Sequence, residues 1–336
     1  MSEFLKKKLI RSKSTGSFYK NNTSSVDENI SIIYDAGYTG HKLMTVNNKK
    51  IPYTEDRYIN FSFDNNRYKV IGVTDGHGGS TEVSILVSGS IYIYLQNNIK
   101  KYDIINAILE TFKNINDLIK LKKKKGGSTL TLCIIDNILK KAYIANLGDS
   151  VTQIFRKENN SLKNIFRTID HDAENINEQK RIKEIYEDVL FEKNITRGYA
   201  IYAKYNSREI MVVGSFGDLH FPPNFIRKIP DINIIDLQKD DIIICSSDGY
   251  YETYNSCHNI LGPGRDEQEI IDDLNNLNLE NKVYNSKLIA SDLLDKHLNN
   301  IVKLCLNKKY NGTYEYIYNI IKTNRDNNTL IVYTIL

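Results

Sequence analysis

Apolar residues along this chain follow two patterns, one with the period of a β-strand and one with the period of a helix. Short runs of consecutive or alternating apolar residues, bounded by turn-forming residues, are typical of strands. Such runs predict strands at residues 70–74, 130–134, 142–146, 210–216, 241–246 and 329–335. Asp136–Asn137 lies between the second and third runs and is a turn signal, so we expect these two runs to form an antiparallel hairpin.

Apolar residues spaced three and four positions apart predict helices. The clearest pattern spans 104–119; it follows Asp103, a good N-cap, and ends in Lys122–Lys125 and then Gly126–Gly127. Weaker patterns predict helices at 173–188, 267–278 and 286–306. Residues 80–98 are ambiguous, because they combine strand-forming residues with an apolar stripe of helical spacing. Strands with intervening and flanking helices predict a layered domain of sheets and helices.

The composition is that of a globular protein with a substantial core. The chain has 336 residues, of which 41% are hydrophobic and 26% charged. No apolar run approaches the roughly 20 residues that a membrane-spanning helix needs, and the N-terminus turns basic at once, unlike a secretory leader. The four cysteines are widely spaced, which argues against a zinc site or a disulfide framework. We therefore expect an intracellular, cytoplasmic protein with no transmembrane segment.

Positive charge is concentrated at the N-terminus. Residues 1–20 contain six Lys or Arg and one Glu, whereas the whole chain has a net charge of +4, so the remainder is close to neutral. A body without a basic field argues against nucleic acid binding. Residues 1–30 are polar and aperiodic and are expected to form a disordered tail, with 31–336 as a single domain. The tail is interpreted as a solvated arm; contact with an acidic partner or an anionic membrane surface is the alternative.

Acidic residues recur beside glycine where the predicted strands end. They are Asp75–Gly76, Gly148–Asp149, Gly217–Asp218 and Asp248–Gly249, together with Asp326 before the last strand and Glu55–Asp56 ahead of the first. One such pair alone is best explained as a turn. Several carboxylates around one sheet system would raise each other's pKa unless a cation lay between them. Oxygen ligands without a His₃ or Cys cluster favour Mg²⁺ or Mn²⁺ over zinc.

Eight short motifs occur in a distinctive order. They are EDR (55–57), DGHGG (75–79), GGST (126–129), ANLGDS (145–150), DH (170–171), FGD (216–218), SSDG (246–249) and RDNNT (325–329). In this order the chain resembles metal-dependent Ser/Thr protein phosphatases of type 2C, over about residues 50–336. The resemblance implies an α+β fold, a four-layer α/β/β/α sandwich in which two antiparallel sheets pack face to face with helices on both outer faces. It also implies a helix after DGHGG.

The resemblance implies a metal-binding role for the acidic residues. Asp75 would bridge two ions, Mg²⁺ or Mn²⁺, and the Gly76 carbonyl would bind one of them. Asp248 and Asp326 would hold the other ion. Glu55 would lie at the ion near Gly76 and act mostly through water.

The resemblance also implies roles for three further residues. Asp149 would belong to a third, weaker metal site. Asp56 would contact the metal ligands without binding a metal itself. His77 would be the general acid that protonates the leaving Ser or Thr oxygen. A metal-bridging hydroxide would attack phosphorus in line, and the cations would neutralise the phosphoryl oxygens.

The chain departs from the family pattern at several positions. Ile51 occupies the position of an Arg that binds the substrate phosphate; Lys50 or Lys49 is a candidate replacement, without the bidentate fork of Arg. Gly214 stands where Arg is usual in the FGD motif, and Glu252 where Asp is usual after SSDG. The DH motif continues as Asp-Ala in place of Lys-Pro.

Three functional hypotheses follow from this sequence. The first is a metal-dependent phosphomonoesterase that removes phosphate from phosphoserine and phosphothreonine of proteins, acting as a monomer. The alternative is a catalytically weak pseudophosphatase, a phosphoprotein-binding module, which Ile51 favours. A small-molecule phosphatase is the third. Residues 172–212 match the variable flap of the family, which is expected to shape access for the phosphorylated protein.

Overall fold

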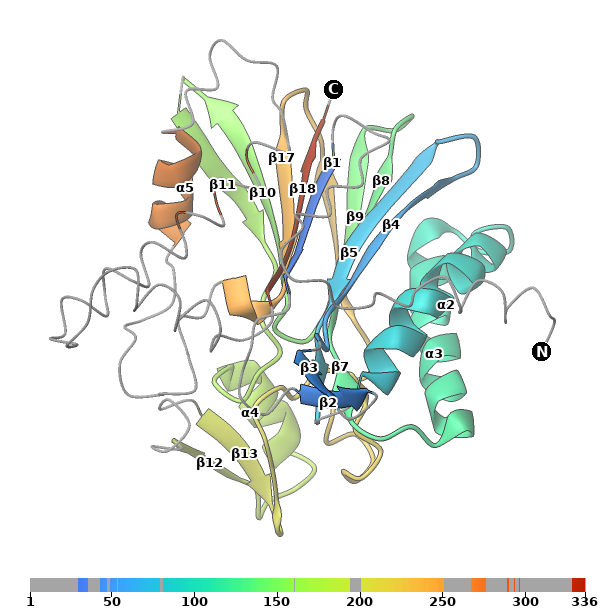
Figure 1. Ribbon diagram of the computed structural model, residues 1–336, viewed down its shortest axis with the longest axis vertical. Coiled ribbons are helices and arrows are strands. Elements are labelled where there is room, and N and C mark those ends of the chain that lie inside the picture. The colour runs from blue at the N-terminus through green and yellow to red at the C-terminus, as the bar shows by residue number, and fades with distance from the viewer. Residues whose placement is uncertain are drawn as a thin grey trace, which may run out of the picture.

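Two five-stranded antiparallel sheets form the centre of the molecule (Figure 1). This computed structural model describes residues 30–35, 43–46, 49–52, 54–78, 81–159, 161–193, 201–250, 267–275, 289, 293, 296 and 328–335. The first sheet has the order β1 (Ile30–Asp35), β18 (Asn328–Thr334), β17 (Ile242–Ser246), β10 (Val151–Glu158), β11 (Ser161–Arg167). The second has the order β16 (Asp231–Asp236), β9 (Lys141–Leu147), β8 (Leu130–Asp136), β5 (Tyr68–Thr74), β4 (Arg57–Phe63).

The two sheets pack face to face through an apolar layer. Ile71 and Val73 of β5 lie in one buried cluster with Ile243 of β17 and Ile331 of β18. Val70, whose side chain points to the opposite face of β5, lies in a different cluster with the helices. Because β5 is covered on both faces, all seven of its residues are buried. The predicted strands at 70–74, 130–134, 142–146, 241–246 and 329–335 are confirmed.

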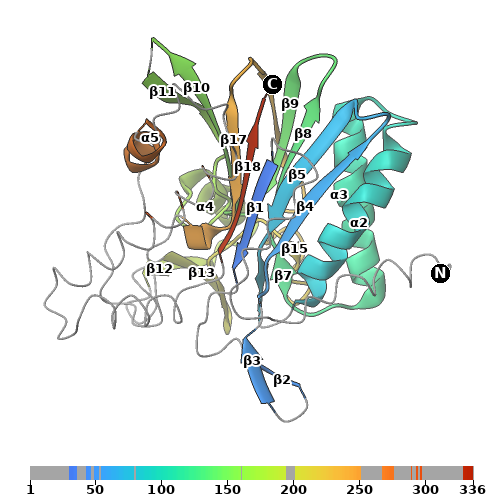
Figure 2. The ribbon, with the colours of Figure 1, turned by 45° about the horizontal axis from the view of Figure 1, so that its top comes forward.

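Helices cover both outer faces of this pair of sheets, as Figure 2 shows. On one side α2 (Glu82–Asn98) and α3 (Ile104–Lys122) pack on the second sheet. On the other side α5 (Glu267–Asn275) packs against residues of β10, β17 and β18. The arrangement confirms the predicted four-layer α/β/β/α sandwich.

The ambiguous segment at 80–98 is a helix. Val83, Val87, Ile91 and Leu95 recur every four residues and are completely buried against the second sheet. This burial outweighs the strand preference of the β-branched and aromatic residues, because intrinsic β-propensity is worth about 1 kcal/mol at most, whereas each buried apolar side chain contributes about 1.5–3 kcal/mol.

The predicted start of α3 is confirmed in detail. The side chain of Asp103 accepts hydrogen bonds from the backbone N–H groups of Ile105 and Asn106, both at 3.0 Å. The helix ends at Lys122, because Lys123 takes a left-handed backbone conformation with φ of 49°. The end therefore comes a few residues before the Gly126–Gly127 pair that was expected to break the helix.

The predicted hairpin around Asp136–Asn137 is also confirmed, as β8 and β9. One oxygen of Asp136 accepts the backbone N–H groups of Ile138 and Leu139, both at 2.9 Å, and the other accepts from Arg67 at 3.0 Å. The turn residue therefore satisfies the backbone of its own hairpin and anchors it to the neighbouring hairpin of the same sheet.

Smaller elements extend from the sandwich. The part of the predicted flap that the structure describes contains α4 (Ile176–Lys183), β12 (Leu190–Lys193), β13 (Ile201–Tyr205) and β14 (Arg208–Ile210). A three-stranded sheet joins β6 (Gly76–His77), β7 (Gly127–Ser128) and β15 (Phe216–Gly217), and a hairpin joins β2 (Leu43–Val46) and β3 (Lys49–Pro52). The flap shares an apolar cluster with the segment that follows it; the cluster includes Ile182 and Ala203 of the flap and Phe225.

One predicted strand, at 210–216, is wrong as a continuous element. β14 ends at Ile210 and β15 begins at Phe216. Between them Val213 donates its N–H to His171, and Ser215 donates its N–H to Arg227. The backbone of this segment forms hydrogen bonds with two different loops, so it does not pair continuously with any one strand.

Three predicted helices are only partly matched. The helix at 173–188 is shorter and forms α4, and that at 267–278 forms α5. Of the helix at 286–306, the structure describes positions 289, 293 and 296, all helical. Of the N-terminal tail predicted at 1–30, residues 1–29 lie outside the described residues, and Ile30 begins β1.

Two further observations bear on possible binding sites. None of the helices that the structure describes is long and apolar enough to cross a membrane.

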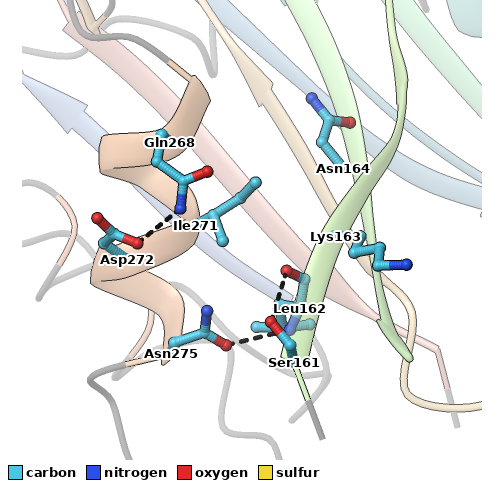
Figure 3. A pocket seen from close by; sticks show the side chains of 8 residues that line it. All are labelled: Ser161, Leu162, Lys163, Asn164, Gln268, Ile271, Asp272 and Asn275. Carbon is cyan, nitrogen blue, oxygen red and sulfur yellow. Dashed lines mark hydrogen bonds between the residues drawn. The ribbon is translucent and has the colours of Figure 1, made fainter. Parts of the chain in front are cut away.

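A cavity of about 450 Å³ lies between β11 and α5 (Figure 3). Its lining is Ser161, Leu162, Lys163, Asn164, Gln268, Ile271, Asp272 and Asn275. It contains none of the acidic or histidine residues singled out from the sequence.

Candidate active site

The motifs that carry the acidic residues meet where β5 and β9 end. Thr129 of GGST joins two of them. The backbone N–H of Asp75 donates to Thr129 Oγ1 at 3.0 Å, and the N–H of Thr129 donates back to the Asp75 carbonyl at 2.8 Å. Thr129 Oγ1 also lies 2.6 Å from Ser150 Oγ. These contacts hold the DGHGG, GGST and GDS segments together.

Asp56 performs the same task for three other segments. Its side chain is completely buried. One of its oxygens accepts hydrogen bonds from Ser247 Oγ at 2.8 Å and from Thr329 Oγ1 at 2.9 Å, and Thr329 donates its N–H to Ser247 Oγ at 3.0 Å. Asp56 therefore ties the first motif to Asp248, which follows Ser247, and to the start of β18. Asp326 itself lies outside the described residues.

Glu55 is held beside Gly76. Ser84 of α2 donates its hydroxyl to the Glu55 backbone carbonyl at 2.6 Å, and Glu55 is 2% exposed. A Cβ atom on Gly76 would lie 2.9 Å from that same carbonyl oxygen, so the close approach requires glycine. The structure thus brings Glu55 and Gly76 together, as expected from the sequence, while their roles as ligands stay a prediction.

Asp149 lies buried in an acidic environment. It is 8% exposed, and its Oδ2 has no hydrogen-bond partner among the residues that the structure describes. Burial raises the pKa of Asp149 well above its usual range, and the negative charges of Asp248, Asp170 and Asp172 raise it further. Such a group needs either a proton or a cation close by.

These residues fit hard divalent ions. A buried carboxylate oxygen without a partner, close to other carboxylates, is the donor type that Mg²⁺ and Mn²⁺ take. Within the described segments, no three His, Cys, Asp or Glu side chains already converge as a preformed metal cage. The predicted ligand Asp326 lies outside those segments.

His77 is paired with a residue to which the sequence interpretation gave no role. Its Nε2 lies 2.7 Å from Asp218 Oδ2, and Ser215 Oγ donates to the same carboxylate oxygen at 2.6 Å. Asp218 is 3% exposed, whereas the His77 side chain is 26% exposed. The FGD motif was the available signal for Asp218, but nothing in the sequence showed that its carboxylate meets His77.

The charges of this pair stabilise each other. Burial lowers the pKa of His77, but the Asp218 carboxylate and its hydrogen bond raise it by more, and the net result is a raised pKa. Burial conversely raises the pKa of Asp218, and His77 together with Ser215 brings it below its usual range. An imidazolium close to a carboxylate is therefore favoured, which is the state that a general acid needs.

Comparison with known proteins establishes the family. The family model described as Protein phosphatase 2C matches residues 39–260, more than half of the chain. The chain belongs to the protein phosphatase 2C family. No curated protein matches the sequence.

Solved structures agree with this assignment at the level of the fold. The chain is similar to a sex-determining protein from C. elegans, with a TM-score of 0.62 and 16% identity over 92% of this chain and 65% of that one. A serine-threonine phosphatase 2C from Toxoplasma gondii gives a TM-score of 0.61 and 15% identity, over 91% and 94% of the two chains. A phosphatase from a pathogenic strain of Toxoplasma gondii gives 0.59 and 13%, over 91% and 92%.

The missing side chain of Gly127 lets His77 and Asp218 approach each other in this protein phosphatase 2C fold. A Cβ atom there would lie 2.1 Å from Asp218 Oδ2 and 2.2 Å from His77 Nε2. We expect Gly127→Ala to separate the pair and lower turnover of a phosphothreonine peptide about 100-fold, the lower range for loss of a general acid. The control is Gly89→Ala on α2, where a Cβ meets nothing within 4 Å. Similar turnover in both variants would contradict the prediction.

Two departures from the protein phosphatase 2C pattern lie partly outside the described structure. Ile51 and Lys50 belong to β3, where Ile51 pairs with Met44 of β2, but their side chains are not described. Glu252 lies outside the described residues. Whether Lys50 binds substrate phosphate therefore stays a prediction.

The third departure, at Gly214, has a structural reason. A Cβ atom at Gly214 would lie 2.6 Å from the Cβ of His171. The two residues also share a backbone hydrogen bond, from the Gly214 N–H to the His171 carbonyl at 3.1 Å. An Arg could not occupy this position without moving His171.

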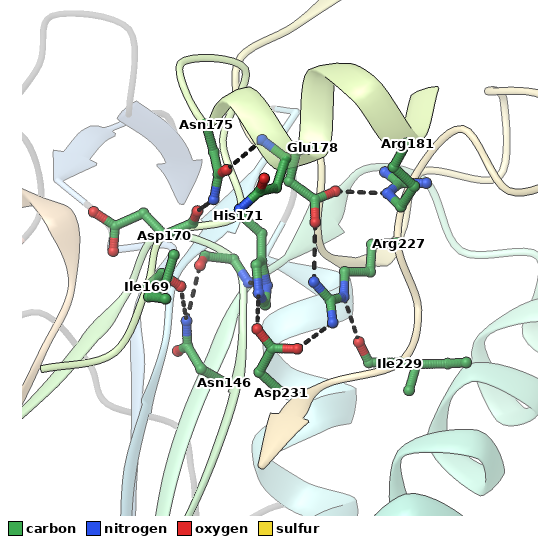
Figure 4. Close-up of polar contacts among 12 residues, drawn as sticks. Asn146, Ile169, Asp170, His171, Asn175, Glu178, Arg181, Arg227, Ile229 and Asp231 are labelled. Atoms are coloured by element: carbon green, nitrogen blue, oxygen red, sulfur yellow. Dashed lines mark hydrogen bonds and ion pairs between the residues drawn. The ribbon is translucent and has the colours of Figure 1, made fainter. Parts of the chain in front are cut away.

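His171 belongs to a network that links the flap to the turn carrying Asp149 (Figure 4). The backbone N–H of Gly148 donates to His171 Nδ1 at 3.3 Å, and His171 Nε2 lies 3.1 Å from Asp231 Oδ2. Arg227 donates to Asp231 and, at 2.9 Å, to Glu178 of α4. His171 is 1% exposed and joins two backbone segments, so its position is that of a structural residue.

Proposed function

We propose that this chain is a metal-dependent phosphomonoesterase that removes phosphate from phosphoserine and phosphothreonine of proteins. The observation that carries the proposal is the pair formed by His77 and Asp218. The His77 side chain is partly exposed to solvent, His77 lies two residues after Asp75, and the negative charge of Glu55 raises the pKa of His77. Membership of the protein phosphatase 2C family supports the reaction class.

Mg²⁺ or Mn²⁺ would be held by the acidic residues. Asp75, the Gly76 carbonyl and Glu55 would hold one ion, Asp75 with Asp248 and Asp326 the other, and Asp149 would contribute to a third site. When bound, such ions supply an activated water near neutral pH and neutralise charge on the phosphoryl oxygens.

The chain's own residues would handle the leaving group. As the bond between phosphorus and the Ser or Thr oxygen breaks, that oxygen takes a proton from the His77 imidazolium, which becomes neutral. Asp218 binds Nε2, and Nδ1, which is buried, has no partner among the described residues. Nδ1 is therefore the nitrogen left to hold the transferable proton, and the leaving oxygen must come within hydrogen-bond distance of it.

The decisive experiment measures hydrolysis of a phosphothreonine peptide in the presence of Mn²⁺, Mg²⁺ or excess EDTA. We expect turnover with either metal and background rates with EDTA. Folded protein that binds Mn²⁺ without turning over the peptide would overturn the proposal. That outcome would favour the second candidate, a phosphoprotein-binding pseudophosphatase, which Ile51 at the phosphate-Arg position supports.

The same assay separates the small-molecule phosphatase from the protein phosphatase. Phosphopeptide and small phosphoesters are compared at equal concentration in Mn²⁺. A preference for the peptide is expected, because the flap adds a structured surface beside the site.

A further inference from the structure

Lys228 is a partly buried cation that lies against the backbone of the FGD motif. It has no role in the function proposed above. Its ammonium donates to the backbone carbonyl of Ser215 at 2.8 Å and to that of Gly217 at 2.7 Å. Burial lowers the pKa of Lys228 to about 8, although the Asp218 carboxylate opposes this shift. The side chain therefore still carries its charge at neutral pH, next to Asp218.

The two carbonyls that Lys228 binds lie on either side of Phe216. Phe216 is completely buried, and its ring packs against Phe112 of α3 with centroids 5.1 Å apart. One end of the segment is fixed where the N–H of Asp218 donates to the Gly126 carbonyl at 2.9 Å. Lys228 thus binds residues 215–217, and the next residue, Asp218, is the partner of His77.

This geometry has two consequences for Asp218. The two hydrogen bonds from the Lys228 ammonium fix the backbone of Ser215 and Gly217. The Ser215 hydroxyl in turn donates to the Asp218 carboxylate at 2.6 Å. The positive charge of Lys228 lowers the pKa of Asp218 and so favours the ionised form, which accepts a hydrogen bond from His77, but it also lowers the pKa of His77. The backbone contacts are therefore the main contribution of Lys228. A displacement of about 1 Å in such an arrangement can cost about 100-fold in rate.

We propose that Lys228 is a positioning residue for proton donation: it holds the 215–218 segment so that Asp218 keeps His77 oriented toward the leaving oxygen. The inference rests on the proposed function, and it assigns Lys228 no contact with substrate. It predicts an effect only on reactions whose leaving group must be protonated.

The test compares two substrates in Mn²⁺. Phosphothreonine peptide has a poor leaving group that needs the acid, whereas p-nitrophenyl phosphate releases a stable anion without one. Lys228→Met keeps the aliphatic stem and removes the donors. We expect it to lower kcat about 10- to 100-fold on the peptide and less than about threefold on p-nitrophenyl phosphate. His77→Ala gives the upper limit of this difference.

Arg181→Met is the matched control. Arg181 also donates to two carbonyls, those of Asn224 at 2.6 Å and Phe225 at 3.0 Å, in the segment that leads to Lys228. Its hydrogen bonds go to Glu178, Asn224 and Phe225, and it reaches residues 215–218 only through Glu178 and Arg227, so both substrates should be affected equally. Equal losses on both substrates in Lys228→Met, or no loss, would overturn the proposal. If this variant does not fold, Lys228→Gln takes its place under the same criterion.

A second measurement separates this proposal from the proposed function. The His77 imidazole N–H signal is followed by NMR in the ¹⁵N-labelled protein, which needs no turnover. We expect its exchange with water to become faster in Lys228→Met and to stay unchanged in Arg181→Met. If the parent protein is inactive but Lys228→Met still speeds the exchange, the proposed function is overturned. Lys228 then remains the residue that holds His77 and Asp218 together. An unchanged signal would overturn the role of Lys228.

Discussion

Asp75→Ala is expected to lower metal-dependent turnover of a phosphothreonine peptide by about 1,000-fold or more, the scale of losing a main electrostatic element of a site. Asp75 follows directly after β5, and its backbone is fixed by two hydrogen bonds with Thr129. Alanine keeps both of them, so the change removes the carboxylate and leaves the strand end in place. Turnover is measured in Mn²⁺, and Mn²⁺ affinity by isothermal titration.

The control for Asp75→Ala is Asp117→Ala on α3. The Asp117 side chain is 59% exposed and makes a long contact of 3.9 Å with Lys120. Its removal changes the net charge by the same amount, and we expect turnover to stay within about twofold, as for most surface substitutions. Asp75→Ala with more than a tenth of the parent rate would show that the site does not depend on this carboxylate.

Asp56→Ala is expected to lower the free energy of unfolding by about 3 kcal/mol, because it leaves two buried hydroxyls, those of Ser247 and Thr329, without their acceptor. Asp56 is itself completely buried, so water cannot replace the lost carboxylate without opening the structure. Urea denaturation followed by circular dichroism measures the change. Turnover should fall as well, because the same oxygen connects the segments that carry Glu55 and Asp248.

Asp136→Ala provides the comparison for Asp56→Ala. Asp136 is also a buried aspartate with several donors, but it lies at the β8–β9 turn. We expect it to destabilise the fold without changing turnover of the protein that remains folded. Loss of turnover in both variants to the same degree would mean that stability alone explains the effect of Asp56.

The sequence was a good guide wherever local pattern and tertiary burial agree. Five of the ten strands of the two sheets, β5, β8, β9, β17 and β18, follow from residue spacing, and so do the hairpin at Asp136–Asn137 and the cap at Asp103. The other five strands, β1, β4, β10, β11 and β16, were not predicted. At 80–98 local propensity was ambiguous, and only burial of the Val83–Leu95 stripe against a sheet decides for a helix. At 210–216 the apolar run is real, but its backbone bonds are taken by His171 and Arg227, which no local pattern reveals.

The candidate site divides in the same way. Asp75, Gly76 and Glu55 were identifiable because the motif order placed them, and the structure brings Glu55 against Gly76. The Asp218 partner of His77 is 141 positions away in sequence, and its approach depends on the missing side chain of Gly127. Lys228 could not be found from the sequence, since it acts on backbone carbonyls, which carry no sequence signature.

The position of β18 has a consequence for how the protein is made. This strand lies inside the first sheet, between β1 and β17, although it is the last described strand to leave the ribosome. Until it is synthesised, β1 and β17 have unpaired edges facing each other, and Thr329 is not there to bind Asp56. The chain can complete the second sheet and its helices without β18, but it gains the first sheet and the contact between Thr329 and Asp56 only when β18 is present. A chain that lacks β18 would therefore leave the edges of β1 and β17 open and would be prone to aggregation.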